Sequence, residues 1–119
     1  MLKAKEEIQG WIPVTFSSRV DAFNVDRFKD SLSSFSADHK KLALDMREVQ
    51  FVNFEAIKHI HQVAIDMEDR GAELALVGPT EKLKRQVSLF ASLDPIRVFS
   101  RSEWMSLTSA TTEVTESRP

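Results

Sequence analysis

The sequence predicts a single α/β domain built on a largely parallel β-sheet. Short apolar runs that suit buried strands alternate with longer stretches of helical periodicity. Strands that alternate with helices in this way are usually joined by right-handed crossovers, which makes them parallel. A chain of 119 residues has room for one such domain with one hydrophobic core. The expected element order is ββαβαβαβα, with a β-hairpin at the N-terminus and four helices.

The same patterns place each element along the chain. The expected elements are a hairpin over 2–7 and 11–17, a helix from 25, a strand over 42–46, a helix over 54–70, a strand over 74–77, a helix capped by Thr80, a strand over 96–99 and a short helix capped by Ser100. Asn24 is expected to cap the first helix, with Phe23 and Phe28 forming a hydrophobic staple. The polar run 33–39 is expected to be a loop, and Gly71 is expected to end the second long helix.

The domain is expected to span residues 1–107, followed by a disordered tail over 108–119. This tail is rich in serine and threonine and shows no periodicity. The first nine residues, MLKAKEEIQ, lack the apolar segment of a secretory signal. No apolar run approaches the roughly 20 residues of a membrane span. We therefore expect a cytoplasmic protein that does not insert into a membrane.

Composition and motifs argue against most classes of enzyme. The chain has no cysteine, and its three glycines lie too far apart for a phosphate-binding loop. No serine occupies the nucleophile elbow of hydrolases. Asp45 ends a strand, where it is expected to cap the following turn rather than act as a catalytic carboxylate. We therefore expect no catalytic residue, no cofactor and no enzyme activity.

The histidines and the basic residues are interpreted as surface groups. His59 and His61 are two residues apart, which places them on different faces of a helix, and His39 is expected in a loop. The net charge is -2, and the basic run over 82–85 has no interleaved aromatic residue. Neither a metal site nor a nucleic-acid partner is expected.

The stretch from Lys41 to Met67 is the unit in which function is expected. It is predicted to form a buried strand, a sharp turn and an amphipathic helix, and binding sites in α/β folds lie where strands end. Phe54 and Ile65 lie off the core face of this helix, where they either tuck under a loop or anchor a protein partner. The core face is expected to consist of Ala56, Ile57, Ile60, Val63, Ala64 and Met67. The polar residues beside Phe54 and Ile65 are Lys58, His61, Gln62 and Asp69.

Four segments follow one another in an order that resembles a known family. They are Ser18–Phe23 (compare G-x-L-D-A), Leu44–Val52 (L-D-L-S-x-V-x-F-I), Gly71–Gly78 (G-x-x-L-x-L-V-G) and Leu93–Phe99 (L-D-x-x-x-x-F). This order and spacing resemble the STAS domain, which sulphate transporters and anti-sigma-factor antagonists share. The resemblance covers roughly positions 2–107 and implies the STAS fold with a regulatory function.

In that family, the turn before the second helix reads D-S-[ST]-G-L, and a partner kinase phosphorylates the second hydroxyl residue. The corresponding residues here are Asn53, Phe54, Glu55, Ala56 and Ile57. Glu55 therefore occupies the phosphoacceptor position, where there is no hydroxyl group to phosphorylate. Its charge is favoured at a helix N-terminus. It either imitates a phosphorylated state or is an ordinary helix-start acid in a domain that never used phosphorylation.

The resemblance implies a non-enzymatic partner-binding module of the anti-sigma-factor antagonist type. The implied partner is a protein, such as a kinase-like anti-sigma factor, and phosphorylation at the turn is not expected to control binding. The expected partner-binding residues are Asn53, Phe54, Glu55, Lys58, His61, Gln62 and Ile65. One alternative is a nucleotide- or lipid-binding or transporter-accessory module, in which Lys58 or Arg19 contacts an anion. Another is a homodimer formed through the edge of the N-terminal hairpin.

Overall fold

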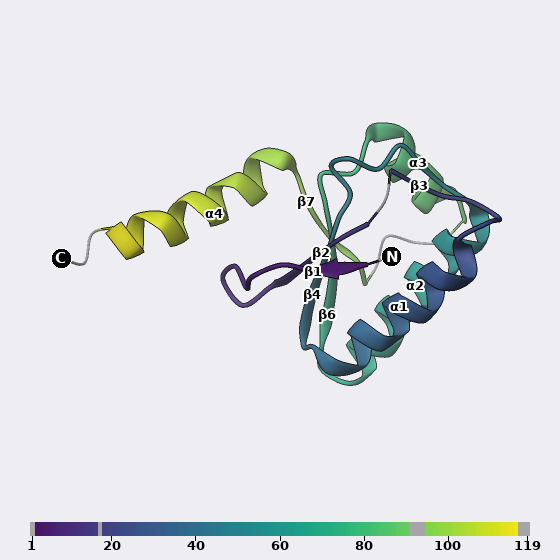
Figure 1. The fold of residues 1–119 in the computed structure, drawn as a ribbon, viewed down its shortest axis with the longest axis horizontal. Helices are drawn as coiled ribbons and strands as arrows, with labels where there is room; N and C mark the ends of the chain where they lie inside the picture. Colours follow the sequence, from purple (N-terminus) through teal and green to yellow (C-terminus); the bar gives the residue numbers. More distant parts are fainter. Residues whose placement is uncertain (1, 17, 91–94, 117–119) are drawn as a thin grey trace.

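A computed structural model describes residues 2–16, 18–90 and 95–116, and its centre is a five-stranded sheet (Figure 1). The strand order is β1-β2-β4-β6-β7. β1 and β2 form an antiparallel hairpin, and the remaining neighbours are parallel. The strands are β1 (Lys3–Ala4), β2 (Ile12–Thr15), β4 (Lys41–Asp45), β6 (Glu73–Val77) and β7 (Arg97–Phe99). The predicted α/β class, with its N-terminal hairpin and largely parallel sheet, is confirmed.

Three helices cover one face of this sheet. They are α1 (Val25–Asp38), α2 (Phe54–Asp69) and α3 (Glu81–Phe90). Their apolar side chains share a core with Leu42 and Leu44 of β4 and with Leu74 and Leu76 of β6. All six residues predicted for the core face of α2 are buried. The alternation of buried leucines along β4 and β6 therefore sets the side on which the helices pack.

The opposite face of the sheet carries a second, smaller cluster. Trp11 meets the edge of Phe99 with a centroid separation of 5.4 Å, and Phe99 contacts Trp104 at 5.6 Å. Ala43 and Ala75 are paired in the sheet and belong to the same cluster. The small side chains of Ala43 and Ala75 leave space for the indole rings of Trp11 and Trp104. These rings cover this face of the sheet in place of a full layer of helices.

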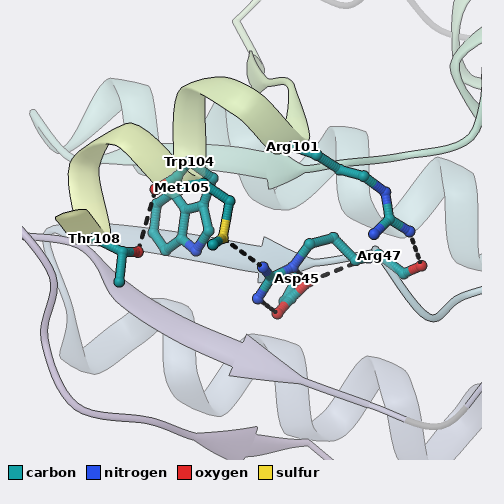
Figure 2. A network of polar contacts seen from close by, with 6 residues as sticks. All are labelled: Asp45, Arg47, Arg101, Trp104, Met105 and Thr108. Atoms are coloured by element: carbon teal, nitrogen blue, oxygen red, sulfur yellow. Dashed lines mark hydrogen bonds and ion pairs between the residues drawn. The ribbon is translucent and has the colours of Figure 1, made fainter.

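Helix α4 (Arg101–Glu116) begins on this second face and then projects away from the body of the domain (Figure 1). A reciprocal cap starts it: Ser100 accepts from the N–H of Glu103, and the Glu103 carboxylate accepts from the N–H of Ser100. Figure 2 shows how its first turns are held. The Arg101 guanidinium donates to the carbonyl of Arg47 at 2.7 Å, and the Arg47 guanidinium reaches the Met105 sulfur at 3.7 Å.

One predicted loop is helical instead. The run 33–39 was expected to be a loop, but α1 continues to Asp38, where Ser36 is buried and its hydroxyl donates to the carbonyl of Ser33. Helix α4 as described reaches Glu116, and the division into a domain over 1–107 and a disordered tail over 108–119 stays a prediction.

The start of α1 also differs from expectation. The Phe23 side chain is 98% exposed, so the predicted hydrophobic staple with Phe28 is wrong. Asn24 makes no side-chain cap for α1. Its amide instead closes the preceding turn, accepting from the N–H of Asp21 at 2.8 Å and donating to the carbonyl of Arg19 at 3.1 Å. Asparagine suits both uses, and only the path of the chain decides between them.

Two very short strands were not predicted. β3 (Arg19–Val20) and β5 (Phe51–Val52) pair in parallel as a separate two-stranded ribbon. Strands of two residues are too short to show a period in the sequence. The ribbon matters because it joins the segment before α1 to the segment before α2.

Candidate functional site

The turn at 53–56 is fixed on its N-terminal side by the β3–β5 ribbon. The N–H of Asn53 donates to the carbonyl of Val20 at 2.9 Å, and the N–H of Gln50 donates to the carbonyl of Ser18 at 2.6 Å. These bonds satisfy backbone groups that would otherwise be unpaired. The loop before α1 and the turn before α2 therefore leave the ribbon together at one end of the molecule.

Asn53 fixes the turn on its C-terminal side as the N-cap of α2. Its backbone is extended, and its side-chain oxygen accepts a hydrogen bond of 2.9 Å from the N–H of Ala56. The N–H of Ile57 then donates to the Asn53 carbonyl at 3.1 Å. This is the usual geometry of an asparagine N-cap. The cap aligns the first turn of α2 and places Phe54 and Glu55 at its start.

Phe54 is the exposed aromatic group of the turn. Half of its surface is accessible, and the Lys58 ammonium lies 5.4 Å from the ring centroid. Lys58 is one helical turn further along α2, so both side chains stand on one stripe. A shallow pocket of about 340 Å³ borders them, lined by Lys29, Phe54, Glu55, Lys58, His59 and Gln62.

Glu55 does not stand alone at the helix start, because Lys29 of α1 reaches it. The Lys29 ammonium donates to the Glu55 carboxylate at 2.8 Å. The hydrogen bond from Lys29 holds the pKa of Glu55 below its ordinary value, and the same bond raises the pKa of Lys29. Both groups are therefore charged near neutral pH, and they form an ion pair across the seam between α1 and α2.

His59 lies next to this pair on the same seam. Its Nε2 atom is 3.1 Å from the hydroxyl oxygen of Ser33 in α1. Burial lowers the pKa of His59, so the imidazole is largely neutral at neutral pH. The positive charges that border the pocket are therefore those of Lys29 and Lys58.

The expected site residues divide into two groups. Phe54, Glu55, Lys58 and Gln62 meet at the pocket. Asn53 lies beneath them as the cap, while His61 and Ile65 are half-buried and do not line the pocket. Two lining residues, Lys29 and His59, were not predicted. His59 follows Glu55 by one helical turn, a signal that could have been read, whereas Lys29 enters only because α1 packs beside α2.

Arg19 and Asp45 were also weighed as functional residues, and the structure places both in ion pairs outside the pocket. Arg19 does not line the pocket with Lys58; its guanidinium pairs with Asp21 at 3.4 Å and lies over the Phe51 ring. Asp45 caps its turn as predicted, accepting from the N–H of Arg47 at 3.1 Å. It also accepts from the Arg47 guanidinium at 2.9 and 2.7 Å (Figure 2). Asp45 is thus held in an ion pair with Arg47.

The part of the chain that the structure describes also bears on metal binding, membrane crossing and a second pocket. Within those residues, no three histidine, aspartate or glutamate side chains are grouped to hold a metal ion. None of the described helices combines the length and the apolar character that a bilayer crossing requires. A second pocket, of about 600 Å³, lies at the carboxyl ends of β6 and β7, between the first turns of α3 and α4.

Several solved structures share this fold. The anti-sigma factor antagonist SpoIIAA of Bacillus, in its unphosphorylated form, superposes with a TM-score of 0.67 at 11% identity, over 93% of this chain and 98% of that chain. A candidate anti-sigma factor antagonist of Thermotoga maritima gives 0.70 at 18% identity, over 96% and 94%. A serine-to-glutamate variant of Moorella thermoacetica RsbS gives 0.68 at 14% identity, over 93% and 97%.

No curated protein sequence matches the chain significantly. At such low identities, the structural likeness shows a common fold and no more. The sequence pattern of one family is more specific, because the STAS domain pattern matches residues 3–104. That match covers most of the chain and all seven strands, together with the first three helices. The protein therefore belongs to the STAS domain family.

Proposed function

We propose that this protein is a non-enzymatic, cytoplasmic regulatory module that binds a protein partner through the turn 53–58 and the outward side of α2. The partner is a kinase-like anti-sigma factor or a related regulator. The observation that carries the proposal is Phe54, an aromatic side chain left half exposed at the first position of a firmly capped helix. Exposed aromatic groups on a rigid frame are typical anchors of protein interfaces.

The proposal includes the way in which the turn is regulated. The chain has no hydroxyl group between Asn53 and Ile57, so this turn cannot accept a phosphoryl group there. Glu55 takes the position that the family uses as its phosphoacceptor. Binding is therefore controlled by something other than phosphorylation at this turn.

The test is calorimetric titration of the protein against a panel of purified kinase-like anti-sigma factors from the same genome. We expect one member to bind, and Phe54→Ala to weaken that binding by at least about tenfold. Leu89→Ala is the matched control, because Leu89 is an exposed apolar residue of α3 that does not border the pocket. Binding by no member of the panel, or equal losses in the two variants, would contradict the proposal.

A second candidate function is small-ligand binding, and one observation favours it. The pocket of about 600 Å³ at the ends of β6 and β7 is bordered by Lys84 and Arg101. A nucleotide at 100 times its dissociation constant would stabilise the fold by about 2.7 kcal/mol. Thermal melting with and without ATP or GTP measures this gain. An unchanged Tm at millimolar nucleotide would contradict nucleotide binding and would leave protein binding as the one candidate function.

A further inference from the structure

We propose that Lys29 is the residue that allows a glutamate to stand at the partner-binding turn: its ammonium group neutralises Glu55, and tight partner binding depends on this pairing. The inference rests on the proposed function, which it deepens by naming how the site is kept competent. Because the Lys29 ammonium balances the Glu55 carboxylate, the turn presents no net charge to the partner at position 55. Glu55 is then not an imitation of a phosphorylated residue.

The geometry of the pair supports this role. The two charged groups come from different helices and lie 2.8 Å apart, within hydrogen-bond distance. The side chains are 33% exposed for Lys29 and 54% exposed for Glu55. Both border the pocket beside Phe54. A partner that covers Phe54 would therefore also cover this ion pair.

The ion pair matters more for the stability of the complex than for the stability of the free domain. In the free domain, a solvent-exposed ion pair adds little to stability, because water screens both charges. In a complex, the water is displaced, and a carboxylate left without its partner loses solvation that nothing replaces. Removing Lys29 should therefore weaken binding far more than it weakens the fold.

Neighbouring charges do not take over the role of Lys29. Lys58 is one turn beyond Glu55, but its ammonium lies over the ring of Phe54. The charge of Lys58 lowers the pKa of Glu55 less than the hydrogen bond from Lys29 does. On α1, Asp26 and Asp30 flank Lys29 and add negative charge near it. Without Lys29, the site would therefore become more acidic.

The experiment is a double-mutant cycle on the anti-sigma factor of the panel that binds the wild type. Lys29→Met should weaken binding by at least about tenfold, because it leaves Glu55 unpaired under the partner. Glu55→Gln leaves the Lys29 ammonium unpaired at the same place and should also weaken binding. The double variant Lys29→Met/Glu55→Gln should recover most of the loss, since no charge is then left unpaired.

Lys82→Met is the matched control, because Lys82 is an exposed lysine of α3 that borders neither pocket. It should leave both binding and Tm close to wild type. A second readout needs no partner: in Lys29→Met, the Glu55 carboxylate should titrate at higher pH by NMR. Unchanged binding or an unchanged Glu55 titration in Lys29→Met, or a double variant as weak as Lys29→Met, overturns the inference alone. If the wild type binds no member of the panel, the proposed function fails, and the inference fails with it.

Discussion

The side-chain oxygen of Asn53 accepts a hydrogen bond of 2.9 Å from the backbone N–H of Ala56. Asn53 thereby contacts both the β3–β5 ribbon and α2, because its own N–H donates to the carbonyl of Val20. The exposed ring of Phe54 and the paired carboxylate of Glu55 start from this cap. The placement of both side chains therefore depends on the cap that Asn53 provides.

Replacing Asn53 by alanine should lower the free energy of unfolding by about 1 kcal/mol, because the helix loses its side-chain cap. Tm should fall by a few degrees, as measured by thermal melting followed by circular dichroism. Asn53→Asp keeps an acceptor oxygen at the same place and should stay close to wild type. Equal losses for the two variants would show that the cap is not what asparagine contributes here.

Asp45 should make stability depend on pH. Burial by itself would raise the pKa of Asp45, but its hydrogen bonds and charge interaction with Arg47 outweigh this effect, so the pKa lies below its ordinary value. The resulting stabilisation is fully present above the unfolded-state pKa of about 4 and is lost as the pH falls through the folded-state pKa.

Asp45→Asn should therefore destabilise the protein at pH 7 by about 1–3 kcal/mol, because the charge-assisted bonds to Arg47 are weakened. The difference from wild type should shrink as the pH is lowered from 5 towards 3. Urea unfolding at several pH values measures both effects. A difference that is constant over this range would rule out the ionised Asp45 as its source.

Gly78 allows Arg47 and Arg101 to approach each other. Its φ is +59°, and an added Cβ would lie 2.6 Å from Cγ of Arg47 and 3.1 Å from Cγ of Arg101. Gly71 is the matched control, because its φ is +77° with nothing within 4 Å of such a Cβ. Gly71→Ala should cost about 1 kcal/mol for the backbone alone, and Gly78→Ala should cost at least about twice as much. Chemical unfolding of the two variants gives the comparison; equal costs would mean that the arginines simply move aside.

Much of the fold could be predicted because its signals are local. The buried face of α2 follows from helical spacing alone, and all six predicted residues are buried. The caps at Thr80 and Ser100 follow from residue chemistry, and both form: each hydroxyl accepts a backbone N–H three residues later. The end of α2 at Gly71, whose φ is positive, is equally local.

The failures concern choices that the local sequence leaves open. Phe23 fits a hydrophobic staple equally well whether or not the loop turns it towards α1, and it is almost wholly exposed. The serines over 33–39 are compatible with loop or helix, and packing of Ser36 against the body selects helix. The β3–β5 ribbon exists only because two distant segments meet. In each case, tertiary contacts decide between local alternatives of similar energy.

The sequence by itself determined the α/β class, the strand–turn–helix unit and the absence of a hydroxyl residue between Asn53 and Ile57. These follow from periodicity, capping chemistry and residue identity, which are properties of neighbours in the chain. Only the tertiary structure decided that Glu55 meets Lys29, because the two lie 26 positions apart and are joined by the packing of α1 against α2. A charge is defined by its residue, but its effect depends on which group lies within a few ångströms of it.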